Sequence, residues 1–331
     1  FKNFVDRLLK FPDQVSLDCF RLSDRISWND EDHDFDVSGW ICAALCRGVK
    51  EIDLDLDFFG CVLTVPAVLF TCHSLVTLKL NAACRKIDVP SDVCLGNLKT
   101  LQLRNTVVDG DSIHRLISNC HVLEDLAFIE CHLEYASASA LNIKTPFLKR
   151  LVLDLDAVEF GDFNNVVVIN APNLEKADIS IYLFGSSDRE TSATHLIQGI
   201  CTVRSLNLTI HDVIFRMCRL PIFHNLIEFE YGGLPIFHNL IEFEYGGLGS
   251  NGRETWLVEF LHCAPNLNTL TLNFLVVVET QWKVLHMEVP SCLSLHLKEI
   301  KILNFKGDMR MFEMISYFLD NAMVLEKLMI G

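Results

Sequence analysis

The chain has 331 residues, half of them apolar, so it can bury a large core and does not have a disordered composition. Its formal net charge of −15 argues against a general nucleic-acid binder, which needs a basic face, and against docking on an anionic membrane. The 13 cysteines are scattered without a C-x-x-C pair, which favours a reducing compartment, so we expect the protein in the cytoplasm, the nucleus or both. No run of 18 apolar residues predicts a membrane-spanning helix.

Residues 1–48 predict a helix, a strand and a second helix that form the first unit, or cap, of the fold. The apolar residues behind this prediction are Phe4, Val5, Leu8 and Leu9 for a helix over 2–10, Val15, Leu17 and Cys19 for a strand over 14–22, and Val37, Trp40, Ile41, Ala44 and Leu45 for the second helix. An acidic loop over 29–36 separates the strand from the second helix. The chain begins with Phe1 and has no signal-peptide core, so we expect it to continue upstream in the full protein.

The stretch GNLKTLQLRN (residues 96–105) carries the pattern L-x-x-L-x-L, which recurs along the chain. The first positions of the copies are Val49, Leu75, Leu98, Leu123, Leu148, Leu174, Val203, Leu226, Leu240, Leu267, Leu297 and Leu325. Their spacings are 23 to 30 residues with one exception of 14, close to the 20–29 window of leucine-rich repeats. The pattern predicts an α/β leucine-rich-repeat solenoid, with a curved parallel sheet on the concave face and mixed helix and loop on the convex face. The repeats are expected over residues 49–288.

Two of the segments that return the chain between strands predict helices. One has Ile113, Leu116 and Ile117 on one face after Asp111, which we expect to be the N-cap. The other has its apolar face formed by Trp256, Leu257, Phe260 and Leu261.

The exceptional spacing of 14 residues comes from a duplication. Residues 220–233 read LPIFHNLIEFEYGG, and residues 234–247 repeat this segment letter for letter. Fourteen residues are too few for a strand and its return path, so we predict that the two copies do not both occupy full repeat positions. Removing one copy would restore ordinary spacings of 23 and 27 residues.

Residues 289–331 are expected to close the array as a C-terminal cap, because a solenoid must hide its terminal core. The pattern predicts a strand over 297–303, a turn over 305–307, a helix and a last strand over 325–330. The expected inner face of this helix is formed by Phe312, Ile315, Phe318 and Leu319.

The two ends of the chain resemble the plant F-box proteins that combine leucine-rich repeats with an FBD segment. The C-terminal stretch LKEIKILNFKG…MFEMISYFLDNAMVLEKLMI is similar to the FBD segment, and FKNFVDRLLKF, VSLDCFRL and VKEIDLDL are similar to the family's first repeats. The phrases APNLEKADI and APNLNTLTL are also typical of the family. The resemblance implies a substrate receptor of an SCF-type ubiquitin ligase. The F-box, which docks on the Skp adaptor and normally precedes this stretch, is absent from residues 1–331.

Catalytic and ligand motifs are absent from the sequence. It contains no G-x-S-x-G, G-x-x-x-x-G-K or H-E-x-x-H. The glycine cluster GGLGSNG (residues 246–252) includes a G-x-G-x-x-G spacing but lacks a lysine and follows the duplicated strand, so we interpret it as a loop. We therefore expect no enzymatic activity, no catalytic residue and no cofactor. Four Cys-His neighbour pairs match no zinc spacing, and we interpret them as apolar filler beside turns, so no metal site is predicted. The acidic row formed by Asp53, Asp55 and Asp57 is interpreted as a solvated edge.

The remaining candidates are the outward residues between the repeat leucines, which line up into one surface in a stacked array. The residues that we predict to contact a protein partner are Thr77, Lys79, Thr100, Gln102, Arg104, Asp125, Arg150, Asp154, Lys176, Asp178, Glu228 and Glu230. The favoured function is a protein-interaction module that holds a protein substrate on this face, with no nucleic-acid or membrane partner. Two alternatives stay open: a free-standing scaffold or decoy without a ligase link, and a small-molecule sensor that shares its ligand with a partner.

Overall fold

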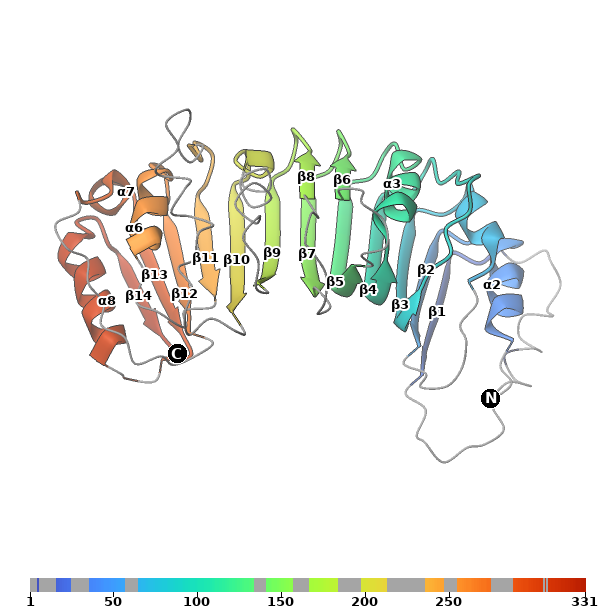
Figure 1. The fold of residues 1–331 in the computed structure, drawn as a ribbon, viewed down its shortest axis with the longest axis horizontal. Coiled ribbons are helices and arrows are strands. Elements are labelled where there is room, and N and C mark those ends of the chain that lie inside the picture. Colours follow the sequence, from blue (N-terminus) through green and yellow to red (C-terminus); the bar gives the residue numbers. More distant parts are fainter. Residues whose placement is uncertain are drawn as a thin grey trace. The chain divides into compact units, whose positions relative to one another are not determined.

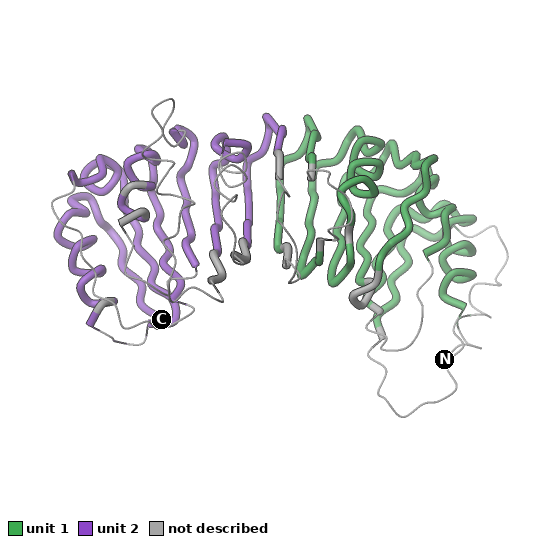
Figure 2. Tube along the Cα trace, viewed as in Figure 1, with its two compact units in different colours: residues 1–158 green, residues 159–331 purple. Residues whose placement is uncertain are grey.

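The computed structural model describes residues 5, 16–24, 36–56, 65–133, 141–156, 167–183, 198–212, 236–246, 255–274, 288–305, 307 and 309–331. The chain divides into two compact units, residues 1–158 and residues 159–331 (Figure 2). Each unit is a stack of repeats built on parallel strands (Figure 1). None of the helices in the described part of the chain has the length and apolarity needed to cross a membrane.

Unit 1 is built on six parallel strands, each paired with the next in chain order except for β6, which lies outside this sheet. The strands are β1 (Cys19–Asp24), β2 (Glu51–Leu56), β3 (Thr77–Lys86), β4 (Thr100–Val108), β5 (Asp125–Leu133), β6 (Leu141–Lys144) and β7 (Arg150–Asp156). The helices whose bounds lie in the described part of unit 1 are α2 (Val37–Leu45), the 3-10 helix η1 (Ala67–Thr71) and α3 (Gly110–Ser118), which packs against β6. The short helices and extended segments return the chain from the end of one strand to the start of the next.

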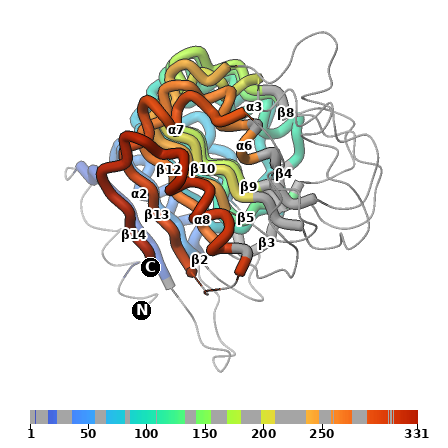
Figure 3. Tube along the Cα trace, turned by 90° about the vertical axis from the view of Figure 1, so that its left-hand side faces the viewer, coloured from blue at the N-terminus to red at the C-terminus, as the bar shows by residue number. Residues whose placement is uncertain are grey.

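Unit 2 repeats this arrangement with six parallel strands, β9 to β14, paired in chain order. Its strands are β8 (Val167–Asn170), β9 (Lys176–Leu183), β10 (Ser205–Asp212), β11 (Glu242–Gly246), β12 (Thr269–Asn273), β13 (Glu299–Leu303) and β14 (Lys327–Ile330). The helices whose bounds lie in its described part are α6 (Thr255–His262), α7 (Ser291–Leu295) and α8 (Met309–Asn321). Figure 3 shows this unit from its C-terminal end, with β14 and α8 in the foreground.

The repeat leucines form the core, as the pattern predicts. Leu98 and Leu101 are fully buried, and Leu103 is 2% exposed. Parallel pairing in register sets Leu101 beside Leu78 on β3 and beside Leu126 on β5, so equivalent leucines stack on one another. Burying one such side chain contributes about 1.5–3 kcal/mol, and a single repeat has no second layer to bury it against. The leucine-rich-repeat fold class is therefore confirmed.

The first strand is shifted from its predicted position. It covers Cys19–Asp24 rather than 14–22, and its buried residues are Phe20 and Leu22, each 8% exposed. Cys19, which belongs to the alternation behind the prediction, is half-buried. Phe20 and Leu22 pair in register with Ile52 and Leu54, whose side chains are in the core, and a one-residue slip exchanges the two faces of a strand. Of the helix predicted over 2–10, only Val5, which is helical, lies within the described residues.

Helix α3 confirms the predicted apolar stripe but corrects its cap. Ile113, Leu116 and Ile117 are all at most 3% exposed. The N-cap is Asp109 rather than Asp111, because the Asp109 carboxylate accepts a hydrogen bond of 2.9 Å from the Ser112 backbone N–H. In the other two predicted helices, α2 buries four residues of its stripe and leaves Leu45 half-buried, and α6 buries Leu257, Phe260 and Leu261 completely.

The duplicated segment contributes its second copy to the sheet. That copy provides β11, which pairs directly with β10 on one side and with β12 on the other. The first copy, residues 220–233, lies outside the described residues. Since the sheet position next to β10 is filled by the second copy, the register agrees with the prediction that the two copies do not both occupy full repeat positions.

The C-terminal end is less covered than a cap would require. On α8, Ile315 and Phe318 are buried as predicted, but Phe312 is 51% exposed and Leu319 is 44% exposed. The inner face of α8 is completed by Met311 and Met314 instead. On β14, Leu328 and Ile330 align with the buried Ile300 and Ile302 but are 38% and 52% exposed. No other described strand pairs with β14 on its far side.

Candidate protein-binding face

The side chains that alternate with the repeat leucines point away from the core and form a surface on each sheet, which we call the ladder face. In unit 1 its described residues form three rows across the strands: Cys19, Glu51, Thr77, Thr100, Asp125 and Arg150; then Arg21, Asp53, Lys79, Gln102, Ala127 and Val152; then Ser23, Asp55, Asn81, Arg104 and Ile129. Parallel strands lie about 4.8 Å apart, so neighbours in a row are within side-chain reach.

The structure brings seven of the predicted residues together in these rows. Thr77, Thr100, Asp125 and Arg150 follow one another in the first row. In the second row, Lys79 is the direct partner of Gln102. Arg104 lies beside Asn81 in the third row.

The first row contains an ion pair that fixes two of these side chains. The guanidinium group of Arg150 binds both carboxylate oxygens of Asp125, and the Thr100 hydroxyl donates a hydrogen bond of 3.4 Å to the same carboxylate. Arg150 nevertheless keeps 63% of its side chain exposed. The charge-assisted hydrogen bond from Arg150 to Asp125 Oδ2 restrains the planar guanidinium group, which favours recognition of a partner over a loosely held charge.

Two cations of the ladder face, Lys79 and Arg104, have no such partner in the part of the chain that the structure describes. No described acidic residue pairs with the ammonium group of Lys79 or with the guanidinium group of Arg104, although Arg104 is exposed. Lys79 and Gln102 are half-buried. The hydrogen-bond donors of Lys79 and Arg104 are therefore available to a bound molecule.

The N-terminal part of the ladder face was missed by the sequence reasoning. Arg21 donates to Glu51 at 2.7 Å and lies 4.0 Å from a carboxylate oxygen of Asp53. Asp55 accepts a hydrogen bond of 2.7 Å from the Asn81 amide. Asp53 and Asp55 were interpreted as a solvated edge, and the sequence signal for their role is their alternation with core residues in the first repeat strand. Asp57, the third acidic residue of that row, lies outside the described residues.

Asp154 is a predicted residue with an unusual environment. It follows Leu153 on β7, is half-buried, and its Oδ1 atom is buried without a hydrogen-bond partner among the described residues. A buried carboxylate oxygen without a donor is costly, since it has lost its water and gained nothing in return. A donor from a bound molecule would compensate for this loss.

The predicted residues of unit 2 lie on a separate stretch of ladder face. Lys176 is the direct partner of Ser205, and Asp178 is the direct partner of Asn207. Glu228 and Glu230 lie outside the described residues, so their prediction stays untested. Their counterparts in the second copy are Glu242 and Glu244, which continue the rows of Ser205 and Asn207 on β11.

The described cysteines are free thiols, and three of them, Cys120, Cys131 and Cys292, are buried. Burial raises the pKa of the Cys120 and Cys292 thiols to about 12 and that of Cys131 to about 11, which leaves all three protonated and unreactive. Cys72 and Cys263 are half-buried rather than fully inward. Within the described ranges, no three His, Cys, Asp or Glu side chains gather in a way that could hold a metal ion.

Comparison with known families places these features in context. The model of the leucine-rich repeats of the FBD-associated F-box protein At5g56370 matches residues 37–215, and the FBD model matches residues 287–330. The chain belongs to the plant F-box/FBD/LRR-repeat family. The first match begins at α2 and covers β2 to β10, and the second covers α7, β13, α8 and β14.

Several proteins of Arabidopsis thaliana are similar to this F-box/FBD/LRR-repeat family member along nearly all of its length. A putative F-box/LRR-repeat protein, At3g42770, is 28% identical over 96% of the chain and 59% of its own length. The putative F-box protein At3g44060 is 27% identical over 98% of the chain and 78% of its own length. The F-box/FBD/LRR-repeat protein At1g13780 is 26% identical over 99% of the chain and 77% of its own length. The chain thus spans three-fifths to four-fifths of these relatives, and no solved structure matches it.

Proposed function

We propose that this chain is the substrate-recognition part of an F-box subunit of an SCF-type ubiquitin ligase, and that its ladder face binds the protein substrate. Membership of the F-box/FBD/LRR-repeat family supports an interaction module. In the proposal, an F-box elsewhere in the full-length protein contacts the Skp adaptor. The chain itself contributes binding and no catalytic step.

The observation that carries the proposal is the state of the charged residues on the ladder face of unit 1. The pair of Arg150 and Asp125 is held in place before any partner binds. Lys79 and Arg104 offer donors that no described acidic residue occupies, and the buried Oδ1 of Asp154 lacks a donor. A surface with ordered groups and unsatisfied ones of both charges fits a protein partner of complementary pattern.

The test uses the full-length protein expressed in plant cells, with quantitative mass spectrometry of the proteins that co-purify with it. We expect the variant Lys79→Ala/Arg104→Ala to recover a specific ubiquitinated protein at least about fivefold less well, because each charged contact of an interface contributes on the order of 1 kcal/mol. Recovery of the Skp adaptor should not change. The matched control is Lys144→Ala, which removes an exposed lysine on β6, outside the ladder face.

Two outcomes would contradict the proposal. Equal recovery of every co-purified protein by the wild type and the ladder-face variant would exclude this face as the binding surface. Failure of the full-length protein to recover a Skp adaptor would exclude the ligase role and favour the scaffold alternative. The small-molecule alternative predicts a deep polar pocket on the ladder face, whereas the groove that unit 1 shows lies beside the strand starts and does not favour it.

A further inference from the structure

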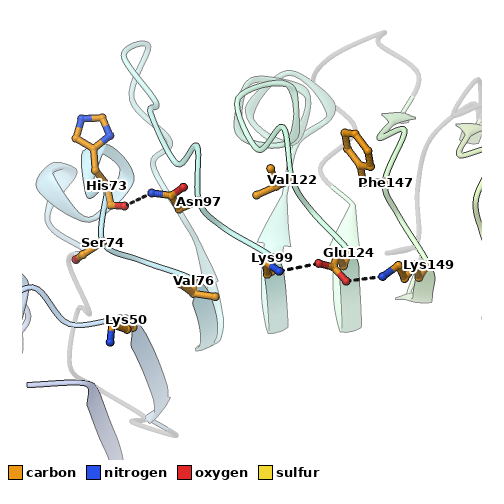
Figure 4. A pocket seen from close by; sticks show the side chains of 10 residues that line it. All are labelled: Lys50, His73, Ser74, Val76, Asn97, Lys99, Val122, Glu124, Phe147 and Lys149. Carbon is orange, nitrogen blue, oxygen red and sulfur yellow. Dashed lines mark hydrogen bonds and ion pairs between the residues drawn. The ribbon is translucent and has the colours of Figure 1, made fainter.

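Unit 1 contains a groove with a volume of about 560 Å³ that runs across the beginnings of its strands (Figure 4). One wall is formed by the residues that directly precede the strands β2, β3, β4, β5 and β7. We call these residues the start row: Lys50, Val76, Lys99, Glu124 and Lys149. The opposite wall comes from the turns before them. The groove lies at the edge of the sheet and does not include the predicted residues of the ladder face.

The start row has a fixed spacing. The backbone N–H of Val76 donates a hydrogen bond of 2.7 Å to the carbonyl of Lys50. In the same way, the backbone N–H groups of Lys99, Glu124 and Lys149 each donate a hydrogen bond of 2.8 Å to the carbonyl of the preceding member of the row. Adjacent members therefore follow the strand spacing of about 4.8 Å. The three lysines occupy every second position, so their backbones are about 9.6 Å apart.

The groove is basic in a chain that is strongly acidic. Its wall carries three lysines and one glutamate, and Asp18 pairs with Lys50, so these groups have an excess of one positive charge, whereas the whole chain has a formal net charge of −15. Glu124 lies between Lys99 and Lys149 and accepts from both, at 3.0 and 2.8 Å (Figure 4). Both lysines keep about half of their side chains exposed, at 55% and 48%. The Lys99 ammonium group has three donors, so its bond to Glu124 leaves others for a ligand.

Lys50 completes the row at the other end of the groove. Its ammonium group lies 2.8 Å from a carboxylate oxygen of Asp18, whose side chain is 77% exposed. A pair that is this accessible to water contributes little and exchanges readily for another carboxylate.

The opposite wall has an apolar part and a part that is held by a hydrogen bond. Phe147 is 57% exposed, which is unusual for a side chain of its size, and Val122 lies beside it along the same wall (Figure 4). Further along, the Asn97 amide donates a hydrogen bond of 2.7 Å to the carbonyl of His73, which fixes the turn. A ligand in the groove would meet lysines on one side and an aromatic ring on the other.

We propose that this groove binds a short acidic segment of a partner protein in the polyproline II conformation, with a carboxylate at every third residue. A polyproline II helix has three residues per turn and rises about 3.1 Å per residue, so such carboxylates repeat every ~9.3 Å on one side. This repeat is close to the backbone spacing of Lys50, Lys99 and Lys149, about 9.6 Å. The ammonium groups of Lys99 and Lys149 both contact Glu124 and would separate to reach two carboxylates. Glu124 then faces a gap between two carboxylates, and the prolines of the segment pack on Phe147, as they do in other aromatic-lined grooves. The proposal stands apart from substrate binding by the ladder face.

The test measures binding of a fluorescein-labelled peptide, Glu-Pro-Pro repeated three times, to the chain of residues 1–331 by fluorescence anisotropy. We expect Lys99→Gln/Lys149→Gln to weaken binding about tenfold, since each accessible charge pair accounts for up to about fivefold. The matched control is Lys298→Gln. Lys298 precedes β13 at the same repeat position in unit 2 and pairs with Glu326 at 2.8 Å, so its loss should change the affinity less than about twofold. Circular dichroism of each variant checks that the fold is retained.

Further measurements test the sign of the charge on the groove wall and the spacing of the peptide's carboxylates. Glu124→Gln removes the one negative charge of the wall and should strengthen binding about threefold. A peptide of the same composition with its three glutamates adjacent should bind more weakly than the regular repeat, and binding should weaken with added salt. Equal loss with Lys298→Gln, equal binding of both peptides, or displacement by inorganic polyphosphate at lower concentrations than by unlabelled peptide would overturn the proposal.

Discussion

Ser205 and Glu242 are direct partners on adjacent parallel strands, although 37 positions separate them in the chain. Thr77 and Thr100, which occupy the same ladder position in unit 1, are 23 positions apart. The difference is 14 residues, the length of the duplicated segment LPIFHNLIEFEYGG. One copy can therefore be removed and leave an ordinary repeat length between β10 and β11.

We predict that deleting residues 220–233 preserves the fold. Because the two copies are identical, deletion of either gives the same chain, and the remaining copy provides β11. A shorter connection between the same strand ends lowers the entropy cost of closing it by less than about 1 kcal/mol, so the melting temperature should stay within a few degrees or rise. Circular dichroism and differential scanning calorimetry measure this. Loss of cooperative unfolding in the shortened chain would show that both copies are structurally required.

Leu101→Ala should destabilise unit 1 strongly. Leu101 is fully buried and packs between Leu78 and Leu126, its partners on the two neighbouring strands. Truncating such a side chain costs about 2–5 kcal/mol, because the cavity closes only in part. Gln102→Ala, one residue further on and on the ladder face, should cost less than about 0.5 kcal/mol. Urea unfolding measures both, and similar losses for the two variants would contradict the alternation of faces.

The fold could be predicted because the signal is repeated. A single L-x-x-L-x-L fits many contexts, but in a stack every copy meets the same requirement, since its leucines must pack on those of the neighbouring repeats. Leu98, Leu101 and Leu103 are buried for this reason. The ladder positions of Thr100, Gln102 and Arg104 then follow from the period of two in a strand.

Features outside the repeated pattern were harder to predict. No described strand pairs with β1 on the side away from β2, so the alternation of Val15, Leu17 and Cys19 was as acceptable in the sequence as that of Phe20 and Leu22. Only pairing with Ile52 and Leu54 decides between them.

The groove was missed for a different reason. The lysines of the start row recur at a fixed repeat position in the sequence, just after Val49, Leu98 and Leu148. Strand alternation singles out residues within the strands, and these lysines directly precede them. The exposed Phe147 on the opposite wall comes from a turn, and turns carry no periodic signal.

Replacing Asp109 should destabilise the chain more than replacing Asp111. Asp109 caps α3, and although burial opposes its ionisation, hydrogen bonds from the backbone and hydroxyl of Ser112 and the ammonium group of Lys86 hold its pKa below the ordinary value. Asp109→Ala should cost about 1 kcal/mol, the usual loss for an N-cap. Asp111→Ala removes only a favourable charge in the first turn and should cost about 0.3–0.5 kcal/mol. Urea unfolding of the two variants gives the comparison, and the reverse order would restore Asp111 as the cap.

The carboxyl group of Glu124 should titrate far below an ordinary glutamate. Hydrogen bonds and charge from Lys149 and Lys99 lower its pKa from 4.5 to about 2. A lowered pKa means that the folded state favours the ionised form, so the stabilising contribution is complete above pH 4.5 and is lost as the pH falls toward 2. Lys149→Gln should move the pKa back toward the ordinary value, because it removes the stronger of the two partners, whereas Lys298→Gln in unit 2 should leave it unchanged. Carbon-13 NMR titration of the side-chain carboxyl measures the pKa directly. A wild-type value near 4.5 would show that the two lysines do not hold Glu124 in solution, and the basic groove would then lack its central bridge.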